Sequence, residues 1–178
     1  MVRLFVGIDL PPEIKLRLEP LCLGLPGAKW VDAGNFHVTL RFIGEVDEAL
    51  ASDIDASLSR LRSPGFSLSL AGVDCFGSAD RPRVLHVKVE PTIDLTRLHD
   101  KVAQAVGRAG VPPDGQRFTP HVTLARLKPG MMPAVQRYIL ANALFRLPPF
   151  PIDRFSLVSS VPTKAGAIYE AVSEYPLG

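Results

Sequence analysis

The chain has 178 residues, of which 47% are hydrophobic and 21% charged, so it is long enough for a substantial core and is neither disordered nor fibrous. Its net charge of +2 is too small to indicate a protein that coats nucleic acid, although 14 of its 20 basic residues are arginine, which suits phosphate. No segment approaches the length of a membrane span, and we expect neither a signal peptide nor a transmembrane helix. Cys22 and Cys75 have no CxxC spacing, which argues against a disulfide framework or a zinc cluster and favours a cytoplasmic protein.

The hydrophobic pattern predicts the same order of elements in each half of the chain. In the first half we expect strands over 3–10, 36–43 and 66–70, with helices over 12–21 and 47–61. In the second half we expect strands over 83–90, 118–127, 155–161 and 168–175, with helices over 94–106 and 133–143.

This duplicated order predicts an α+β fold with two pseudo-symmetric lobes, each an antiparallel sheet backed by helices. The lobes would form roughly from residues 1–77 and 78–178, with a short seam near 77–80. Because no linker of disordered composition separates the halves, we expect a single domain over 1–178 with a central active-site groove. We also expect a monomer.

A repeated tetrapeptide carries the chemistry. His37-Val38-Thr39-Leu40 recurs letter for letter as His121-Val122-Thr123-Leu124, 84 positions later. In a strand the histidine and the threonine of each copy share one face, while valine and leucine share the other. Two imidazoles in matched settings can supply one protonated and one neutral ring, as proton transfer requires.

The sequence around these motifs resembles a known family. Arg41-Phe42-Ile43-Gly44 follows the first copy, Phe118-Thr119-Pro120 precedes the second, and the segments 3–11 and 169–177 add to the likeness. Together they resemble the two-histidine phosphoesterase superfamily, in particular its RNA 2′,3′-cyclic phosphodiesterase branch, historically called 2′-5′ RNA ligase. The likeness covers nearly the whole chain.

The resemblance implies an enzyme that hydrolyses RNA 2′,3′-cyclic phosphate ends, or nucleotides of that kind, to 2′-phosphomonoesters without a metal or other cofactor. It implies that His37 and His121 are the acid and the base, and that Thr39 and Thr123 donate hydrogen bonds to the phosphate. The near-identity of the motifs leaves the two roles open; His121 as base and His37 as acid is the preferred assignment. Arg126 matches an arginine that lies at the mouth of the groove in the family.

Three further residues are candidates for lining the groove, two of them with a plainer alternative. Strict alternation places Arg41 on the face of His37, where it would reach substrate or remain a solvated charge. His86 would stack a base or lie as an exposed strand histidine. Phe5, on the face opposite the apolar side of its strand, would line the groove.

Other aromatic residues are expected to be structural. Phe42 would be core, Trp30 a packing anchor, and His99 structural on its helix.

Other functions remain open at this stage. The same site could run the reaction backwards and join RNA ends through a 2′-5′ bond. A non-catalytic RNA or nucleotide-binding module could keep the groove, although two titratable rings beside two hydroxyls favour catalysis. A zinc site at His37 and His121 would lack a third ligand of the usual type.

Overall fold

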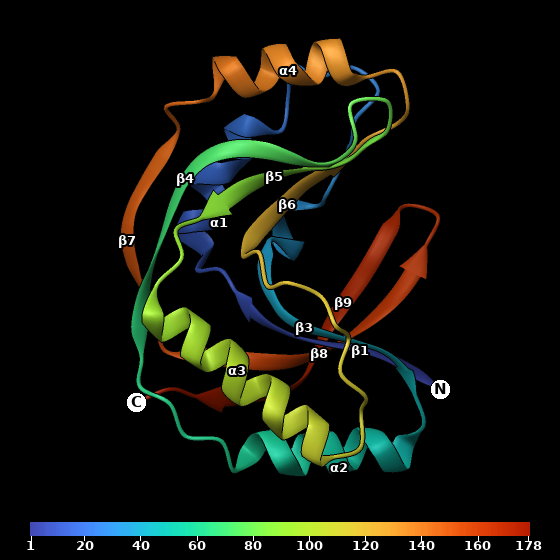
Figure 1. The fold of residues 1–178 in the computed structure, drawn as a ribbon, viewed down its shortest axis with the longest axis vertical. Helices are drawn as coiled ribbons and strands as arrows, with labels where there is room; N and C mark the ends of the chain where they lie inside the picture. The colour runs from blue at the N-terminus through green and yellow to red at the C-terminus, as the bar shows by residue number, and fades with distance from the viewer.

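A computed structural model describes all 178 residues. Its strands form one nine-stranded sheet in which every pairing is antiparallel, in the order β7-β4-β5-β6-β3-β1-β8-β9 with β2 beside β6 (Figure 1). The strands are β1 Val2–Asp9, β2 Lys29–Trp30, β3 His37–Val46, β4 Phe66–Gly77, β5 Pro82–Val89, β6 His121–Arg126, β7 Arg146–Ile152, β8 Arg154–Thr163 and β9 Gly166–Pro176. The helices are α1 Pro12–Leu18, α2 Glu48–Ser59, α3 Ile93–Arg108 and α4 Met132–Ala141, with 3₁₀ turns η1 Glu19–Leu21 and η2 Ala33–Asn35. The predicted α+β class is therefore confirmed.

The sheet has a narrow waist between β3 and β6. These strands pair only at Val38 and Val122, whereas all the other neighbours in the strand order pair over several residues. On one side of the waist lie β3, β1, β8 and β9, and on the other lie β6, β5, β4 and β7. In Figure 1 the two groups form the lower and upper parts of the molecule, with α4 over β4 at the top and α2 and α3 packed together at the bottom.

The two groups of strands do not follow the halves of the chain. β4 comes from residues 1–77 but pairs with β5, because Ser78 and Arg81 close a tight hairpin turn between them. β8 and β9 come from residues 78–178, but β8 pairs with β1 and β9 pairs with β8. The predicted seam near 77–80 is thus a hairpin within one group, and each group takes strands from both halves.

Most predicted elements are present; β2 was not predicted, β4 extends beyond residue 70, and two further differences occur near prolines. Strand β7 was not predicted, because Pro148, Pro149 and Pro151 lie within it; prolines are tolerated there since β7 is an edge strand. The second motif strand begins at His121 rather than at 118, and residues 111–120 are irregular. None of the helices has the length and hydropathy that crossing a membrane requires.

The core lies between the sheet and the helices. Helix α3 buries Leu95, Leu98, Val102 and Val106, which recur at helical spacing on the face turned to the sheet. Strand β5 buries its apolar face as predicted, at Leu85, Val87 and Val89. Because Val38 and Val122 are themselves fully buried, the waist of the sheet is anchored in this core.

Candidate active site

The two copies of the motif meet at the waist of the sheet. His37 and Thr39 flank Val38, and His121 and Thr123 flank Val122, which are the two residues paired across β3 and β6. Since side chains alternate along a strand and both valines are buried, the two histidines and the two threonines lie on the opposite, accessible face. All four are partly exposed. The predicted convergence of the two motifs is present.

Hydrogen bonds fix the tautomer of His37. Its Nδ1 lies 2.7 Å from the carbonyl oxygen of Asn35, which can only accept, so Nδ1 carries the proton and donates it. Its Nε2 lies 2.9 Å from Oγ1 of Thr39. In the neutral ring Nε2 therefore accepts the threonine hydroxyl proton, and it is the nitrogen available for proton transfer.

His121 is held in the same way. Its Nδ1 donates to the carbonyl oxygen of Thr119 at 2.7 Å, again two residues earlier in the chain. Its Nε2 makes no hydrogen bond to the protein, in contrast to that of His37. The repeated sequence thus gives two rings with the same backbone anchor at Nδ1, which directs Nε2 of each ring away from that anchor.

Aromatic side chains enclose His37. Phe5 stacks on the imidazole with ring centroids 4.7 Å apart, and Tyr169 of β9 meets it edge-on at 5.3 Å. The three rings line a cavity of about 130 Å³. Phe5 therefore lies at the site, as its strand face predicted.

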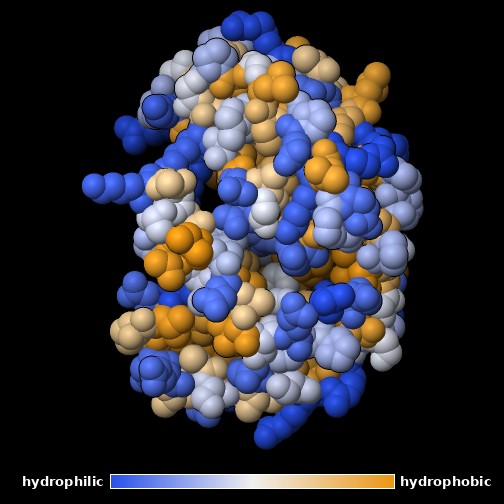
Figure 2. All heavy atoms as spheres, turned by 180° about the vertical axis from the view of Figure 1, so that it is seen from behind, coloured by the Kyte–Doolittle hydropathy of each residue, from blue (hydrophilic) through white to orange (hydrophobic).

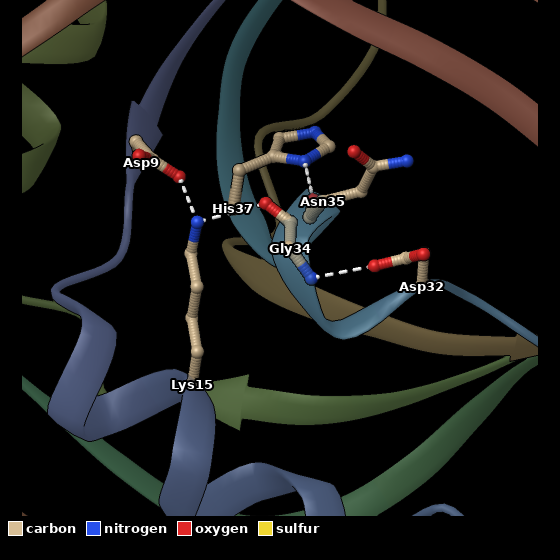
Figure 3. A network of polar contacts seen from close by, with 6 residues as sticks. All are labelled: Asp9, Lys15, Asp32, Gly34, Asn35 and His37. Carbon is tan, nitrogen blue, oxygen red and sulfur yellow. Dashed lines mark hydrogen bonds and ion pairs between the residues drawn. The ribbon is translucent and has the colours of Figure 1, made fainter.

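A lysine on α1 braces the segment that holds His37 (Figure 3). Lys15 Nζ pairs with Asp9 at 2.7 Å and donates to the carbonyl of Gly34 at 2.8 Å, while the Gly34 N–H donates to the Asp32 carboxylate at 2.8 Å. These contacts fix η2, the 3₁₀ turn that ends at Asn35 and presents the carbonyl for His37 Nδ1.

His86 does not line the groove. Its ring is only 3% exposed and lies between Phe76, at 4.1 Å between centroids, and His121, at 5.1 Å. The prediction that it stacks a base or is solvent-exposed is wrong, because Phe76 and His121 cover it. Neither ring nitrogen has a hydrogen-bond partner, which leaves a buried polar ring directly behind His121.

The environment makes all three rings harder to protonate. Burial lowers the pKa of His37, opposed by the Asn35 carbonyl and the Asp9 carboxylate. Burial likewise lowers the pKa of His121, opposed by the Thr119 carbonyl. Burial, followed by the charge of His121, lowers the pKa of His86 to about 4.

A β-bulge in each motif strand overturns the prediction for Arg41. Thr39 pairs with Gly7, and Arg41, two residues later, pairs with the adjacent residue Val6. β3 therefore contains one extra residue, and the side chains after Leu40 point to the opposite face from the one that strict alternation predicts. Arg41 consequently turns inward, is 8% exposed, and donates from Nη2 to the Pro112 carbonyl at 2.6 Å. It also lies 3.7 Å from Asp114, so it braces the loop after α3 instead of reaching the groove.

The same bulge recurs in β6 and brings Arg126 to the accessible face. Thr123 pairs with His86, and Ala125 pairs with the preceding residue, Leu85. Arg126, one position after the bulge, is exposed and lines a cavity of about 470 Å³ beside the site. Its counterpart in β3 is Phe42. The prediction that Phe42 belongs to the core is wrong, because this side chain is 48% exposed.

Two other aromatic predictions hold in part. Trp30 packs against Tyr138 at 6.2 Å between centroids, as expected of an anchor, but it also lines the larger cavity. His99 stacks on Phe118 at 4.0 Å, as expected of a structural residue.

Sequence reasoning missed Asn35, Lys15 and Tyr169. Asn35 acts through its backbone carbonyl, which leaves no side-chain signal, although its position two before His37 matches that of Thr119 before His121. Lys15 and Tyr169 reach His37 from elements distant in the chain, so only the fold brings them there.

No three His, Cys, Asp or Glu side chains are grouped so that they could hold a metal ion.

Comparison with known sequences identifies the family. The sequence model of the 2′-5′ RNA ligase superfamily matches residues 10–163, which is most of the chain. The chain belongs to this superfamily. A relative from Aeropyrum pernix named RNA 2′,3′-cyclic phosphodiesterase is 37% identical over 153 residues, covering 85% of this chain and 86% of the relative. One of the same name from Thermotoga maritima is 33% identical and covers 97% and 94%.

Solved structures of the superfamily share the fold. The protein TT0787 of Thermus thermophilus superposes with a TM-score of 0.82 at 26% identity, over 98% of this chain and 97% of that one. E. coli LigT complexed with 3′-AMP gives a TM-score of 0.78 at 25% identity, over 99% and 98%.

Replacing Arg41 should cost stability. Arg41→Met keeps an apolar stem but removes the charged hydrogen bond to the Pro112 carbonyl and the contact with Asp114, so we expect the free energy of unfolding to fall by about 1–3 kcal/mol. Urea unfolding at pH 7 measures it. Arg126→Met, at an exposed position without hydrogen bonds from its side chain to the protein, is the control, and an equal effect of both substitutions would contradict the bracing role.

The buried ring of His86 should make stability depend on pH. Between its ordinary pKa near 6.5 and its folded pKa of about 4, the unfolded chain binds a proton that the folded chain does not, so the free energy of unfolding falls as the pH drops through that window. His86→Phe removes this contribution, and its urea midpoint should fall less than that of the wild type between pH 7 and pH 4.5. His99→Phe serves as the matched control; identical pH dependence in the wild type and His86→Phe would show that His86 is not buried as a neutral ring.

Proposed function

We propose that the protein hydrolyses RNA 2′,3′-cyclic phosphate ends to 2′-phosphomonoesters, with His37 and His121 as acid and base and without a metal ion. The observation that carries the proposal is the common anchoring of the two rings: each donates from Nδ1 to a carbonyl two residues earlier and keeps Nε2 for the substrate. The relatives named RNA 2′,3′-cyclic phosphodiesterase support the choice of reaction.

The reaction needs two proton transfers at one phosphorus atom. The base takes a proton from water as the water oxygen attacks phosphorus. The bond from phosphorus to the ribose O3′ breaks, and the acid protonates the departing O3′, which leaves the phosphate on O2′. Each histidine contributes through Nε2, and proton exchange with solvent then restores the starting states.

The neighbours of the two rings favour His37 as the acid. Asp9 is the register partner of His37, and its carboxylate raises the pKa of that ring, offset in part by the charges of His121 and Lys15. The corresponding register partner of His121 is Lys88, a cation. A carboxylate helps His37 keep a proton, whereas His121 has no such neighbour and is suited to accept one.

The two threonines suit the non-bridging oxygens of the phosphate. They lie on the same face as the rings, and a hydroxyl donates a hydrogen bond without competing for the transferred proton. Thr39 meets His37 Nε2 before substrate arrives, whereas Thr123 makes no such contact with His121. With two rings for the protons and two hydroxyls for the charge, the mechanism requires no metal ion.

The same groups would catalyse the reverse step. A 5′-hydroxyl in place of water would attack the cyclic phosphate and form a 2′-5′ bond, and the superfamily is named for that activity. Because water is far more abundant than RNA ends, hydrolysis is the main activity we propose.

The test is hydrolysis of an oligonucleotide that ends in a 2′,3′-cyclic phosphate, in excess EDTA, with the product isomer identified by ³¹P NMR. We expect a 2′-phosphate at a rate that the chelator leaves unchanged. His37→Asn and His121→Asn should each lower kcat by about 10²–10⁴, because each removes one proton-transfer group.

His99→Asn is the control for the loss of an imidazole, since that ring lies on α3 and in neither motif. Circular dichroism of each variant checks the fold. A 3′-phosphate product, a rate abolished by EDTA, or near wild-type turnover in either motif variant would contradict the mechanism.

The acid and base can be told apart by the pH profile of kcat/KM. With both rings catalytic the profile is bell-shaped, and since burial lowers both pKa values, its maximum should lie on the acidic side of neutral pH. Asp9→Asn removes the carboxylate that raises the pKa of His37. If His37 is the acid, the alkaline limb moves to lower pH, whereas a shift of the acidic limb instead would make His37 the base.

A further inference from the structure

One polar ring at the site has no part in the hydrolysis described above. Figure 2, which views the molecule from behind, shows a hollow at the left where the β8–β9 hairpin stands away from the upper part. His86 lines neither the larger cavity beside the site nor the smaller one at His37. It is 3% exposed, and neither of its ring nitrogens has a hydrogen-bond partner. A buried imidazole without partners lowers stability, so folding alone does not account for it.

The first motif has no imidazole at the corresponding place. Gly7 of β1 and His86 of β5 hold the same register position, since each pairs with the threonine of its motif. Because Gly7 has no side chain, the ring of Phe5 fills the space, 3.1 Å from the point where a Cβ would stand. Phe5 stacks on His37, and His86 packs on His121. The two supporting rings differ in chemistry, because a neutral imidazole has a nitrogen lone pair and a phenyl ring has none.

As the base, His121 accepts its proton against two unfavourable effects. The ring is partly buried, which lowers its pKa. A charge on His121 also lowers the pKa of His37, and the same repulsion acts on His121 when His37 holds its proton. The register partner of His121 is the cation Lys88, whereas that of His37 is the carboxylate Asp9. An acceptor beside His121 would therefore assist the proton transfer.

His86 supplies such an acceptor. With a pKa of about 4 it is neutral near neutral pH, so one nitrogen carries a proton and the other a lone pair. The centroids of the two imidazoles lie 5.1 Å apart, and Phe76 covers His86 at 4.1 Å. In this low-dielectric setting the dipole of a neutral imidazole stabilises a neighbouring positive charge more than a phenyl ring does.

The charged groups around His86 come from three strands. Asp74 of β4, its register partner, raises its pKa, while His121 of β6 and Lys88 of β5 lower it. The Asp74 side chain is exposed, and its carboxylate accepts the N–H of Cys75. The His86 ring is therefore the polar group that lies in contact with the His121 ring on its buried side.

We propose that His86 is a positioning residue whose unpaired lone pair stabilises the positive charge that His121 gains on taking a proton from the attacking water. The lone pair has no partner in the free enzyme and gains one as the charge forms, so the contact lowers the barrier to reaction. The proposal rests on the proposed function, and His86 acts through His121 alone.

Two substitutions separate this role from packing. His86→Phe keeps a flat ring but has no lone pair, whereas His86→Gln keeps an acceptor oxygen and loses the ring. In His86→Phe, kcat should fall on the order of tenfold with KM unchanged, as expected for loss of one contact to a charged group. The acidic limb of kcat/KM, which reports the base, should move down by about one pH unit, because a tenfold change and one pKa unit are the same free energy. The alkaline limb, which reports His37, should stay. His86→Gln should retain the wild-type profile.

An NMR titration of His121 in the free protein gives a readout that needs no turnover. The pKa of His121 should fall in His86→Phe and stay near the wild-type value in His86→Gln. Asp74→Asn is the matched control, because it removes a charge opposite His86 and leaves both rings in place. In that variant His121 should titrate as in the wild type.

An unchanged His121 titration in His86→Phe overturns the positioning role while the proposed function stands. A loss of activity in His86→Gln but not in His86→Phe overturns it too, since packing alone gives that result, and so does an equal shift in Asp74→Asn. If the wild type hydrolyses no cyclic phosphate, the proposed function itself fails, and the NMR titration still decides whether the two rings interact.

Discussion

The pairing of Val38 with Val122 is the constraint on which the site depends. It is the only strand pairing between the two groups of strands, and both side chains are fully buried in the common core. Because His37, Thr39, His121 and Thr123 flank these two residues, the position of all four follows from the core and from strand alternation. The site is therefore built on rigid strands, which hold catalytic groups more precisely than loops do.

The repeated motif alone would give two equivalent rings, whereas the proposed roles of acid and base need two rings that differ. The backbone anchors are the same, so the difference has to come from the neighbouring strands. His37 has Phe5, Tyr169 and the carboxylate of Asp9 around it, while His121 has Phe76, His86 and the cationic strand partner Lys88. The two histidines thus have the same backbone anchor but different charged and aromatic neighbours.

The sequence predicts what strand periodicity and the repeated motif determine. The fold class, most elements and the convergence of the motifs follow from those two signals, and the proline-rich edge strand β7 was missed because prolines mask a strand pattern. The placement of β4 beside β5, and of β8 and β9 on the side of β1, depends on strand pairing between residues far apart in the sequence. Local sequence patterns do not predict such pairing. The bulges at Leu40-Arg41 and Leu124-Ala125 also leave no signal in the hydrophobic pattern. One extra residue in each strand reverses the side-chain alternation. Arg41, after the first motif, therefore contacts the loop after α3, and Arg126, after the second motif, faces the cavity.

Two features that lower the stability of the fold lie near the waist of the sheet. His86 keeps two unpaired ring nitrogens in the interior, in contact with His121. Lys29 and Arg126 repel each other across two strands beside the same face. A buried unpaired polar group and a like-charge pair each lower stability, and a sequence shaped only for folding would place apolar and complementary residues there. Both departures lie along β6, one beside His121 and one at Arg126, so they coincide with the candidate site.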